Sequence, residues 1–238
     1  MKYLFKCICI ILCAHNALAH NNERIDTQMQ ESARQLIKNI FDDNNTHVQK
    51  NSNAELKSIK NSQAPRATVV SCSDSRVQSS AIDDTSINDL FYIRNIGNQI
   101  STSKGSVIYG VQYLNTPVLL IIGHVDCGAI NTTLADYSNK PASIKRELMS
   151  FDLPVNISPQ DGVISNIHNQ VTVGLDLFKD RVKSNKLVVI GAVYDFQNKY
   201  KKGYNRLIIV NVNGEQDPEK IANSSYLEGI NRAQIGLK

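Results

Sequence analysis

Short apolar runs alternate along the chain with segments in which apolar residues recur at helical spacing. Five of the runs are predicted strands: ATVVSC (67–72), LFYIRNI (90–96), PVLLIIGH (117–124), KLVVIGAVYD (186–195) and RLIIVNVN (206–213). Three of the five are almost continuous Val, Ile and Leu, which is typical of strands covered on both faces. Residues 104–115 and 161–183 have helical periodicity. The alternation predicts an α/β fold with a central, mostly parallel β-sheet flanked by helices.

Both ends of this pattern carry further predicted elements. An amphipathic helix is predicted over 24–41, where Ile25, Met29, Ala33, Ile37 and Phe41 recur at helical spacing. The polar stretch 42–53 is predicted to be a loop, and another helix is predicted from Asp217 to Ala233. Neither an internal repeat nor a low-complexity segment is found. One domain with an N-terminal helical arm is therefore the simplest organisation.

The first 19 residues have the order of a secretory signal peptide. Lys2 and Lys6 precede the apolar stretch 7–14, and Ala17 and Ala19 supply the small residues of a cleavage site. The apolar stretch is much shorter than the roughly 20 residues of a membrane-spanning helix. An uncleaved anchor or a buried first strand is the alternative. Cleavage after Ala19 would give a periplasmic or secreted protein without membrane attachment. The predicted segments are a signal peptide (1–19), an N-terminal helical arm and loop (20–62) and an α/β domain (63–238).

Charge changes this picture little. The 238-residue chain has a formal net charge of +4, and loss of Lys2 and Lys6 with the leader would reduce it to +2. Lys and Arg form no long block, the nearest case being KYKKGYNR (199–206). A nucleic-acid partner is therefore not expected.

Cysteine and histidine mark the ends of two predicted strands. Three of the five cysteines lie in the leader, which leaves Cys72 and Cys127. Cys72 ends one apolar run, and His124 ends another, three residues before Cys127. Because the carboxyl ends of parallel strands meet at one edge of a sheet, the three side chains can converge. Two thiolates and an imidazole suit zinc, with a fourth position left open as in catalytic sites.

Asp74 and Arg76 lie on the same side of an extended segment as Cys72. Paired with Arg76, Asp74 would leave the metal open to water and accept a hydrogen bond from bound hydroxide. Released from Arg76, Asp74 could take the fourth metal position and close the site. An ordinary surface ion pair is the alternative for these two residues. A disulfide between Cys72 and Cys127 also remains possible in an oxidising compartment, but it would leave the neighbouring polar residues unexplained.

Three motifs together resemble the β-class carbonic anhydrases, in particular the plant-like, open-site type. They are CSDSRV (72–77), RNIGN (94–98) and GHVDCGA (123–129), and the resemblance covers about residues 63–194. It implies an α/β enzyme with one Zn²⁺ per chain that interconverts carbon dioxide and bicarbonate. It also implies a homodimer or a dimer of dimers, in which the N-terminal helical arm packs on the partner subunit.

The resemblance assigns roles to individual residues. Cys72, His124 and Cys127 would be the zinc ligands, and Asp74 and Arg76 the catalytic pair beside them. Tyr109 would reach the pocket from the partner subunit. The substrate-binding residues implied are Gln63, Phe91, Ile96, Tyr109 and Gly128.

The chain departs from the family pattern at several positions. Some bacterial members hold a regulatory bicarbonate with a tryptophan, an arginine and a tyrosine. Here Arg94 and Tyr194 match, but Val69 stands in place of the tryptophan, which favours the open type. Val125 and Asp126 replace a commoner serine-containing turn, and Gly97 replaces an alanine; both changes are expected to be minor. Tyr113 replaces a histidine that could shuttle protons in relatives, so the shuttle is not assigned.

The predicted function is zinc-dependent, reversible hydration of carbon dioxide to bicarbonate and a proton, by attack of zinc-bound hydroxide. A hydrolase of carbon disulfide or carbonyl sulfide on the same fold is one alternative. A non-catalytic zinc- or bicarbonate-binding protein is another. A thiol–disulfide redox protein is disfavoured because Cys72 and Cys127 do not form a C-x-x-C motif.

Overall fold

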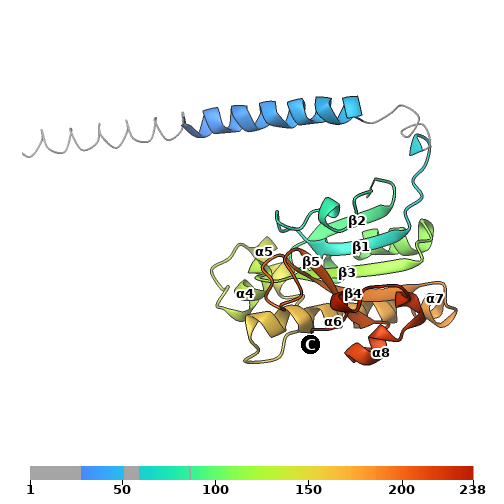
Figure 1. The fold of residues 1–238 in the computed structure, drawn as a ribbon. Coiled ribbons are helices and arrows are strands. Elements are labelled where there is room, and N and C mark those ends of the chain that lie inside the picture. Colours follow the sequence, from blue (N-terminus) through green and yellow to red (C-terminus); the bar gives the residue numbers. More distant parts are fainter. Residues whose placement is uncertain (1–27, 51–58, 86, 238) are drawn as a thin grey trace, which may run out of the picture. The chain divides into compact units, whose positions relative to one another are not determined.

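A five-stranded sheet lies at the centre of residues 62–238. The computed structural model describes residues 28–50, 59–85 and 87–237, and the chain divides into two units, 1–61 and 62–238. The strand order is β2-β1-β3-β4-β5, and all neighbours are parallel except β4 and β5 (Figure 1). The strands are β1 (Ala67–Cys72), β2 (Leu90–Asn95), β3 (Val118–His124), β4 (Val188–Asp195) and β5 (Arg206–Val212). The predicted α/β fold with a mostly parallel sheet is confirmed.

The sheet is covered on both faces, as its apolar composition predicts. Val69 and Val70 are successive residues of β1 and point to opposite faces, yet both are fully buried. Val70 belongs to a core cluster with Ile121 of β3. Val69 packs in a different cluster on the other face with Ile122.

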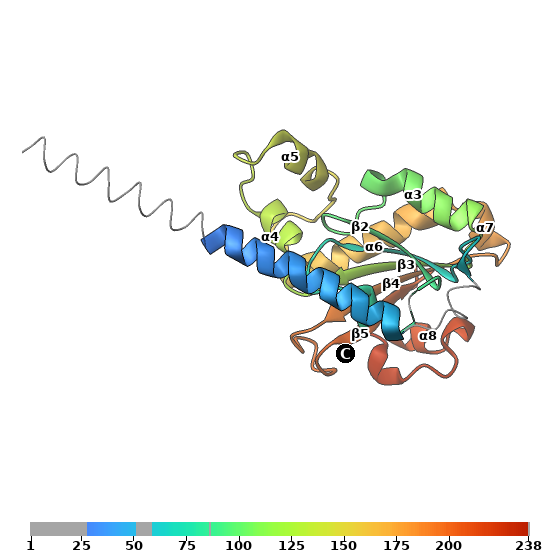
Figure 2. The ribbon, with the colours of Figure 1, turned by 90° about the horizontal axis from the view of Figure 1, so that it is seen from above.

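Helix α6 (Pro159–Leu177) is the longest described helix of the sheet unit and packs along β3 and β4 (Figures 1 and 2). It begins with Ser158, whose hydroxyl accepts the Asp161 N–H at 3.1 Å, as an N-cap should. The helix approaches the sheet closely because two strand residues beneath it are glycines. A Cβ at Gly191 would lie 2.6 Å from Cγ2 of Ile167, and a Cβ at Gly123 would lie 2.8 Å from its Cδ1.

The remaining helices of the sheet unit are short. The α-helices are α3 (Lys104–Ile108), α4 (Gly128–Leu134), α5 (Ala142–Leu148), α7 (Lys179–Lys183) and α8 (Pro218–Ala222). A single π-helical turn, η3 (Tyr109–Tyr113), continues α3. The described part of this unit also contains 3₁₀ turns: η1 (Ser79–Ala81), η2 (Ser101–Ser103), η4 (Ser225–Leu227) and η5 (Arg232–Gln234). The helical prediction over 161–183 is divided between α6 and α7 at the buried Phe178.

The predicted helix from Asp217 to Ala233 is wrong beyond its first turn. Only α8 is an α-helix, and short 3₁₀ turns follow it. The Ser224 hydroxyl accepts the Tyr226 N–H at 3.4 Å, and the Asn231 side chain accepts the Ala233 N–H at 2.9 Å. Such local bonds compete with a continuous helix, and Gly229 between them has φ +82°.

In the N-terminal unit, a helix covers the described residues 28–50. The predicted loop is therefore wrong over 42–50, while 24–27 and 51–53 lie outside the described residues. Lys38 pairs with Asp42 one turn later, and the Thr46 hydroxyl donates to the Asp42 carbonyl at 3.0 Å. Side-chain pairs one turn apart, such as Lys38 and Asp42, support a helix despite the polar composition. The predicted leader also lies outside the described residues. None of the described helices is long and apolar enough to cross a membrane.

Candidate metal centre

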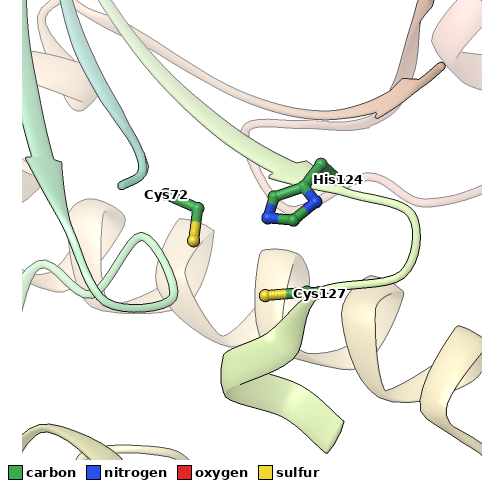
Figure 3. A group of neighbouring side chains, drawn as sticks. All are labelled: Cys72, His124 and Cys127. Atoms are coloured by element: carbon green, nitrogen blue, oxygen red, sulfur yellow. The ribbon is translucent and has the colours of Figure 1, made fainter. Parts of the chain in front are cut away.

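Three side chains, from two adjacent strands and the turn after one of them, converge at the carboxyl edge of the sheet. Cys72 is the last residue of β1, His124 is the last residue of β3, and Cys127 precedes α4. Because β1 and β3 are parallel neighbours, their ends lie side by side. The three possible ligand atoms all lie within 4.8 Å of one another (Figure 3). All three residues are buried.

The His124 ring is oriented by its backbone neighbour. Its Nδ1 lies 2.9 Å from the carbonyl oxygen of Val125, so Nδ1 carries the proton and Nε2 presents a lone pair. Nε2 is buried and has no hydrogen-bond partner among the described residues. Leaving a buried polar atom without a partner costs about 1–3 kcal/mol. A metal ion bound between Nε2 and the two sulfur atoms would satisfy this atom.

The pKa values of the two thiols are shifted in opposite directions. A hydrogen bond with Cys127, opposed by burial and assisted by His124, lowers the pKa of Cys72 to about 4. The same hydrogen bond, together with burial, raises the pKa of Cys127 far above its ordinary value. Backbone N–H groups also favour the thiolates, from Gly97 toward Cys72 and from Ala129 toward Cys127. Replacing the thiol proton with a cation would allow both sulfur atoms to bind as thiolates.

Asp74 and Arg76 form a two-pronged pair beside the three residues. The Arg76 Nε and Nη2 groups donate to the two Asp74 carboxylate oxygens at 2.9 and 2.7 Å. The Arg76 backbone N–H donates to Asp74 Oδ1 at 2.9 Å. These hydrogen bonds hold the pKa of the Asp74 carboxyl well below its usual range. Asp74 Oδ2 lies 3.7 Å from His124 Nε2, so an ionised carboxylate adjoins the candidate ligands.

Arg94 fixes the main chain that carries Cys72 and Asp74. From β2, its Nη2 donates to the Asp74 carbonyl at 2.6 Å and its Nε donates to the Cys72 carbonyl at 3.4 Å. The sequence resemblance connected Arg94 only with a regulatory site. Arg94 lies near the end of β2 and pairs with Ser71 of β1. Correct alignment of these two predicted strands would have indicated the contact.

Two of the predicted substrate-binding residues lie at the same edge. Gly128 is the first residue of α4, directly after Cys127. Ile96 follows β2, where the Asn95 carbonyl accepts the Ser73 N–H at 2.9 Å. Both residues therefore border the metal centre from within the chain.

The other three lie near the amino end of the sheet. Gln63 precedes β1, and Phe91 is paired with Thr68 near the start of the strands. The Tyr109 ring packs against Phe91 in a tilted arrangement, with ring centroids 5.9 Å apart. A strand as long as β1 spans about 20 Å at 3.3 Å per residue. A single chain therefore does not bring Gln63, Phe91 and Tyr109 to Cys72.

Comparisons with known proteins agree with this fold and identify the family. Residues 67–200 match the model of the family described as carbonic anhydrase. Carbonic anhydrase 2 of Mycobacterium tuberculosis is 28% identical over 150 residues, covering 57% of this chain and 72% of that protein. Beta carbonic anhydrase 3 of Arabidopsis thaliana is 26% identical over 201 residues, covering 73% and 77% respectively.

The solved structure of the β-carbonic anhydrase CcaA is similar with a TM-score of 0.64 and 20% identity. The match covers 75% of this chain and 94% of that chain. The fold and the cysteine–histidine–cysteine cluster thus define an α/β protein with a candidate metal centre at the edge of its sheet. The chain belongs to the β-class carbonic anhydrases.

Proposed function

We propose that Cys72, His124 and Cys127 bind one Zn²⁺ and that the chain catalyses reversible hydration of carbon dioxide to bicarbonate and a proton. The observation that carries this proposal is the buried, unpartnered His124 Nε2, which lies among two cysteine sulfur atoms within 4.8 Å. Zinc lowers the pKa of a water molecule to about 7, which makes a nucleophilic oxygen available near neutral pH.

The protein's own residues would orient that chemistry. Asp74 is held ionised by Arg76, so its carboxylate would accept a hydrogen bond from the nucleophilic oxygen and orient a lone pair of that oxygen toward carbon dioxide. Gly128 would bring its backbone N–H to the substrate, and Ile96 would supply an apolar wall. A carboxylate displaced from Arg76 would instead bind the metal, because Asp74 Oδ2 is already 3.7 Å from His124 Nε2.

We also propose that a homodimer or a dimer of dimers is the active form. Gln63, Phe91 and Tyr109 lie far from the metal centre of their own chain, so they would complete the pocket of a partner. The solved structures of two β-carbonic anhydrases from Sordaria macrospora are described as tetrameric, and one of them matches this chain with a TM-score of 0.56 at 18% identity. The exposed apolar side chains of the helix at 28–50, which include Leu36 and Phe41, would pack on the partner.

The leader directs the proposed activity outside the cytoplasm. After its removal, the enzyme would interconvert carbon dioxide and bicarbonate in the periplasm or outside the cell. Zinc would also protect Cys72 and Cys127 there, because bound thiolates are shielded from oxidants.

Stopped-flow carbon dioxide hydration by the zinc-loaded chain lacking residues 1–19 tests this function. We expect activity that rises from neutral to alkaline pH as the nucleophile forms. Asp74→Asn should lower the rate by about 10- to 100-fold, the usual loss when a group that orients a metal site is replaced. Zinc analysis of both proteins provides the control for metal content.

A wild-type protein with one zinc per chain and no hydration activity would contradict the proposal. The same sample would then be assayed with carbon disulfide and carbonyl sulfide, which are linear molecules of similar shape. Activity that is highest at acidic pH would contradict the proposed nucleophile.

A further inference from the structure

A single buried carboxylate organises the turn that follows β4. Asp195, the last residue of this strand, is fully buried. Its oxygens accept the backbone N–H groups of Gln197 at 3.1 Å, Lys199 at 3.0 Å and Tyr200 at 2.8 Å. Because three donors converge on one side chain, the turn has a fixed shape. Phe196 lies within it and takes its direction from this turn.

Phe196 faces both the metal centre and the Asp74–Arg76 pair. The guanidinium carbon of Arg76 lies 4.4 Å from the centre of the Phe196 ring. The same ring is 6.1 Å from the His124 ring. β4 is the parallel neighbour of β3, so the turn after β4 reaches the same edge of the sheet as His124. Arg76 therefore rests on an aromatic face next to a candidate metal ligand.

Asp126 contacts Arg76 from another side. It lies in the turn between His124 and Cys127 with φ +54°. Its carbonyl oxygen accepts a hydrogen bond from Arg76 Nη2 at 3.2 Å, and its carboxylate Oδ2 lies 3.7 Å from Nη1. Gln197 Nε2 donates to the same carboxylate at 3.4 Å. Arg76 thus has two carboxylates within reach, one at Asp74 and one at Asp126.

The orientation of the Arg76 guanidinium plane decides which of the two carboxylates receives its hydrogen bonds. In the structure, Nε and Nη2 of Arg76 both donate hydrogen bonds to the Asp74 carboxylate, at 2.9 and 2.7 Å. The Arg76 side chain is 44% exposed, so surrounding packing on its solvent side does little to hold it. A flat aromatic face attracts the guanidinium and favours a defined arrangement over it. Without the ring, the guanidinium is free to turn toward Asp126, and Asp74 loses its two-pronged partner beside the metal centre.

We propose that Phe196 is a positioning residue for the Asp74–Arg76 pair. Its ring holds the Arg76 guanidinium in the orientation that engages both Asp74 oxygens, and so keeps Asp74 away from the fourth metal position. The inference rests on the proposed function, because it concerns the metal centre of that function. The proposed role of Phe196 is exerted through its contact with Arg76.

The test replaces zinc by Co²⁺, whose visible absorption depends on its ligands and needs no turnover. Phe196→Leu keeps an apolar side chain but removes the aromatic face, and Phe196→Tyr keeps that face. We expect the Leu variant to change the cobalt spectrum toward carboxylate ligation at neutral pH and to lower the hydration rate at least 10-fold. The Phe196→Tyr variant should retain the wild-type cobalt spectrum. In Phe196→Leu with Asp74→Asn, the spectrum should lose the carboxylate signature.

Phe178→Leu is the matched control. This residue is 2% exposed and packs in the core cluster around Val171 and Leu187. The same substitution there should lower the thermal unfolding temperature without changing the cobalt spectrum. Cobalt content and unfolding temperature are measured for every variant. If Phe196→Leu does not load cobalt, Phe196→Met provides a second apolar side chain without an aromatic face.

Loaded Phe196→Leu or Phe196→Met protein with the wild-type spectrum and rate would overturn the inference. A spectral change of the same size in Phe178→Leu would also overturn it, because the effect would then follow from general loss of packing. Failure of the zinc-loaded wild type to hydrate carbon dioxide would contradict the proposed function instead. In that case the cobalt spectra would still decide whether Phe196 controls Asp74.

Discussion

His124 and His168 are each held through one ring nitrogen, with different consequences. His124 directs Nδ1 to a carbonyl and leaves Nε2 available to a metal. His168 on α6 receives the Asn211 side-chain N–H at its Nδ1, at 3.0 Å. This contact requires an unprotonated Nδ1. Burial also lowers the pKa of His168 below its usual value.

His168 should make the folded protein less stable below neutral pH. The unfolded chain takes up a proton at this residue near pH 6.5, whereas the folded chain does so only at lower pH. Stability is therefore lost as the pH falls below about 6.5, with a slope of at most about 1.4 kcal/mol per pH unit from this group. Urea unfolding of wild type and His168→Gln between pH 7.5 and 5.5 measures the difference. Equal slopes in the two proteins would contradict the prediction.

Single residues were predictable where the topology alone places them. Cys72 and His124 end two apolar runs, so the rule for parallel strands brings them together without knowledge of any contact. Phe196 and Arg94 were missed because their roles depend on turn shape and strand register. Asp126 was expected to be a minor change, yet its contact with Arg76 could not be foreseen because it needs a positive φ between His124 and Cys127.

At the scale of the elements, the close approach of α6 to the sheet depends on missing side chains. A Cβ at Gly191 would meet Ile167 Cγ2 at 2.6 Å and Val171 Cγ2 at 2.9 Å. Both atoms lie near the helix backbone and cannot rotate away freely. The strand patterns predicted β4 and β5, but only the packed helix shows why a glycine interrupts the apolar run of β4.

Gly191→Ala should destabilise the fold by about 1–3 kcal/mol, the usual cost of overpacking a core. Gly105→Ala is the matched control, because a Cβ at Gly105 in α3 has no neighbour within 4 Å. That substitution should be neutral or stabilising by up to about 1 kcal/mol, since alanine favours a helix over glycine. Chemical denaturation of the two variants gives the comparison. Similar free energies of unfolding would show that α6 adjusts without cost.

Helix ends were less predictable than strands. Residues 42–50 are mostly polar, but Asp42 pairs with Lys38 one turn earlier, which composition alone does not reveal. In the tail, Ser224 and Asn231 bind nearby backbone N–H groups and divide the predicted helix from Asp217 to Ala233. In both cases, local side-chain contacts determine where the helix continues or ends. Hydrophobic periodicity does not contain this information.

At the scale of the whole molecule, the predicted site residues fall into two groups at opposite ends of the sheet. Cys72, Asp74 and their neighbours occupy the carboxyl edge, whereas Gln63, Phe91 and Tyr109 lie near the amino end. The sequence resemblance placed Tyr109 in the partner, and the sheet geometry extends the same proposal to Gln63 and Phe91. The pocket would then be shared between two chains.

A shared pocket predicts that two defective chains can restore one another. Asp74→Asn and Gln63→Ala chains, each expected to be weakly active alone, are refolded as an equal mixture. Half of randomly formed twofold dimers would be mixed, and each would contain one intact pocket, so about a quarter of wild-type activity is expected. Tagged chains and mass measurement confirm the mixed species. Mixed dimers with no gain in activity would place Gln63 outside the partner's pocket.

The distance along the chain between the candidate ligands has a further consequence for folding. The chain between Cys72 and Cys127 includes β2, α3 and β3. A metal ion held by both cysteines would therefore close a long loop. Such a crosslink restricts the unfolded chain and favours the folded one, and the closure entropy grows slowly with loop length. Zinc bound here would link the ends of β1 and β3 through the turn that carries Cys127, and its binding would favour the folded chain over the unfolded one.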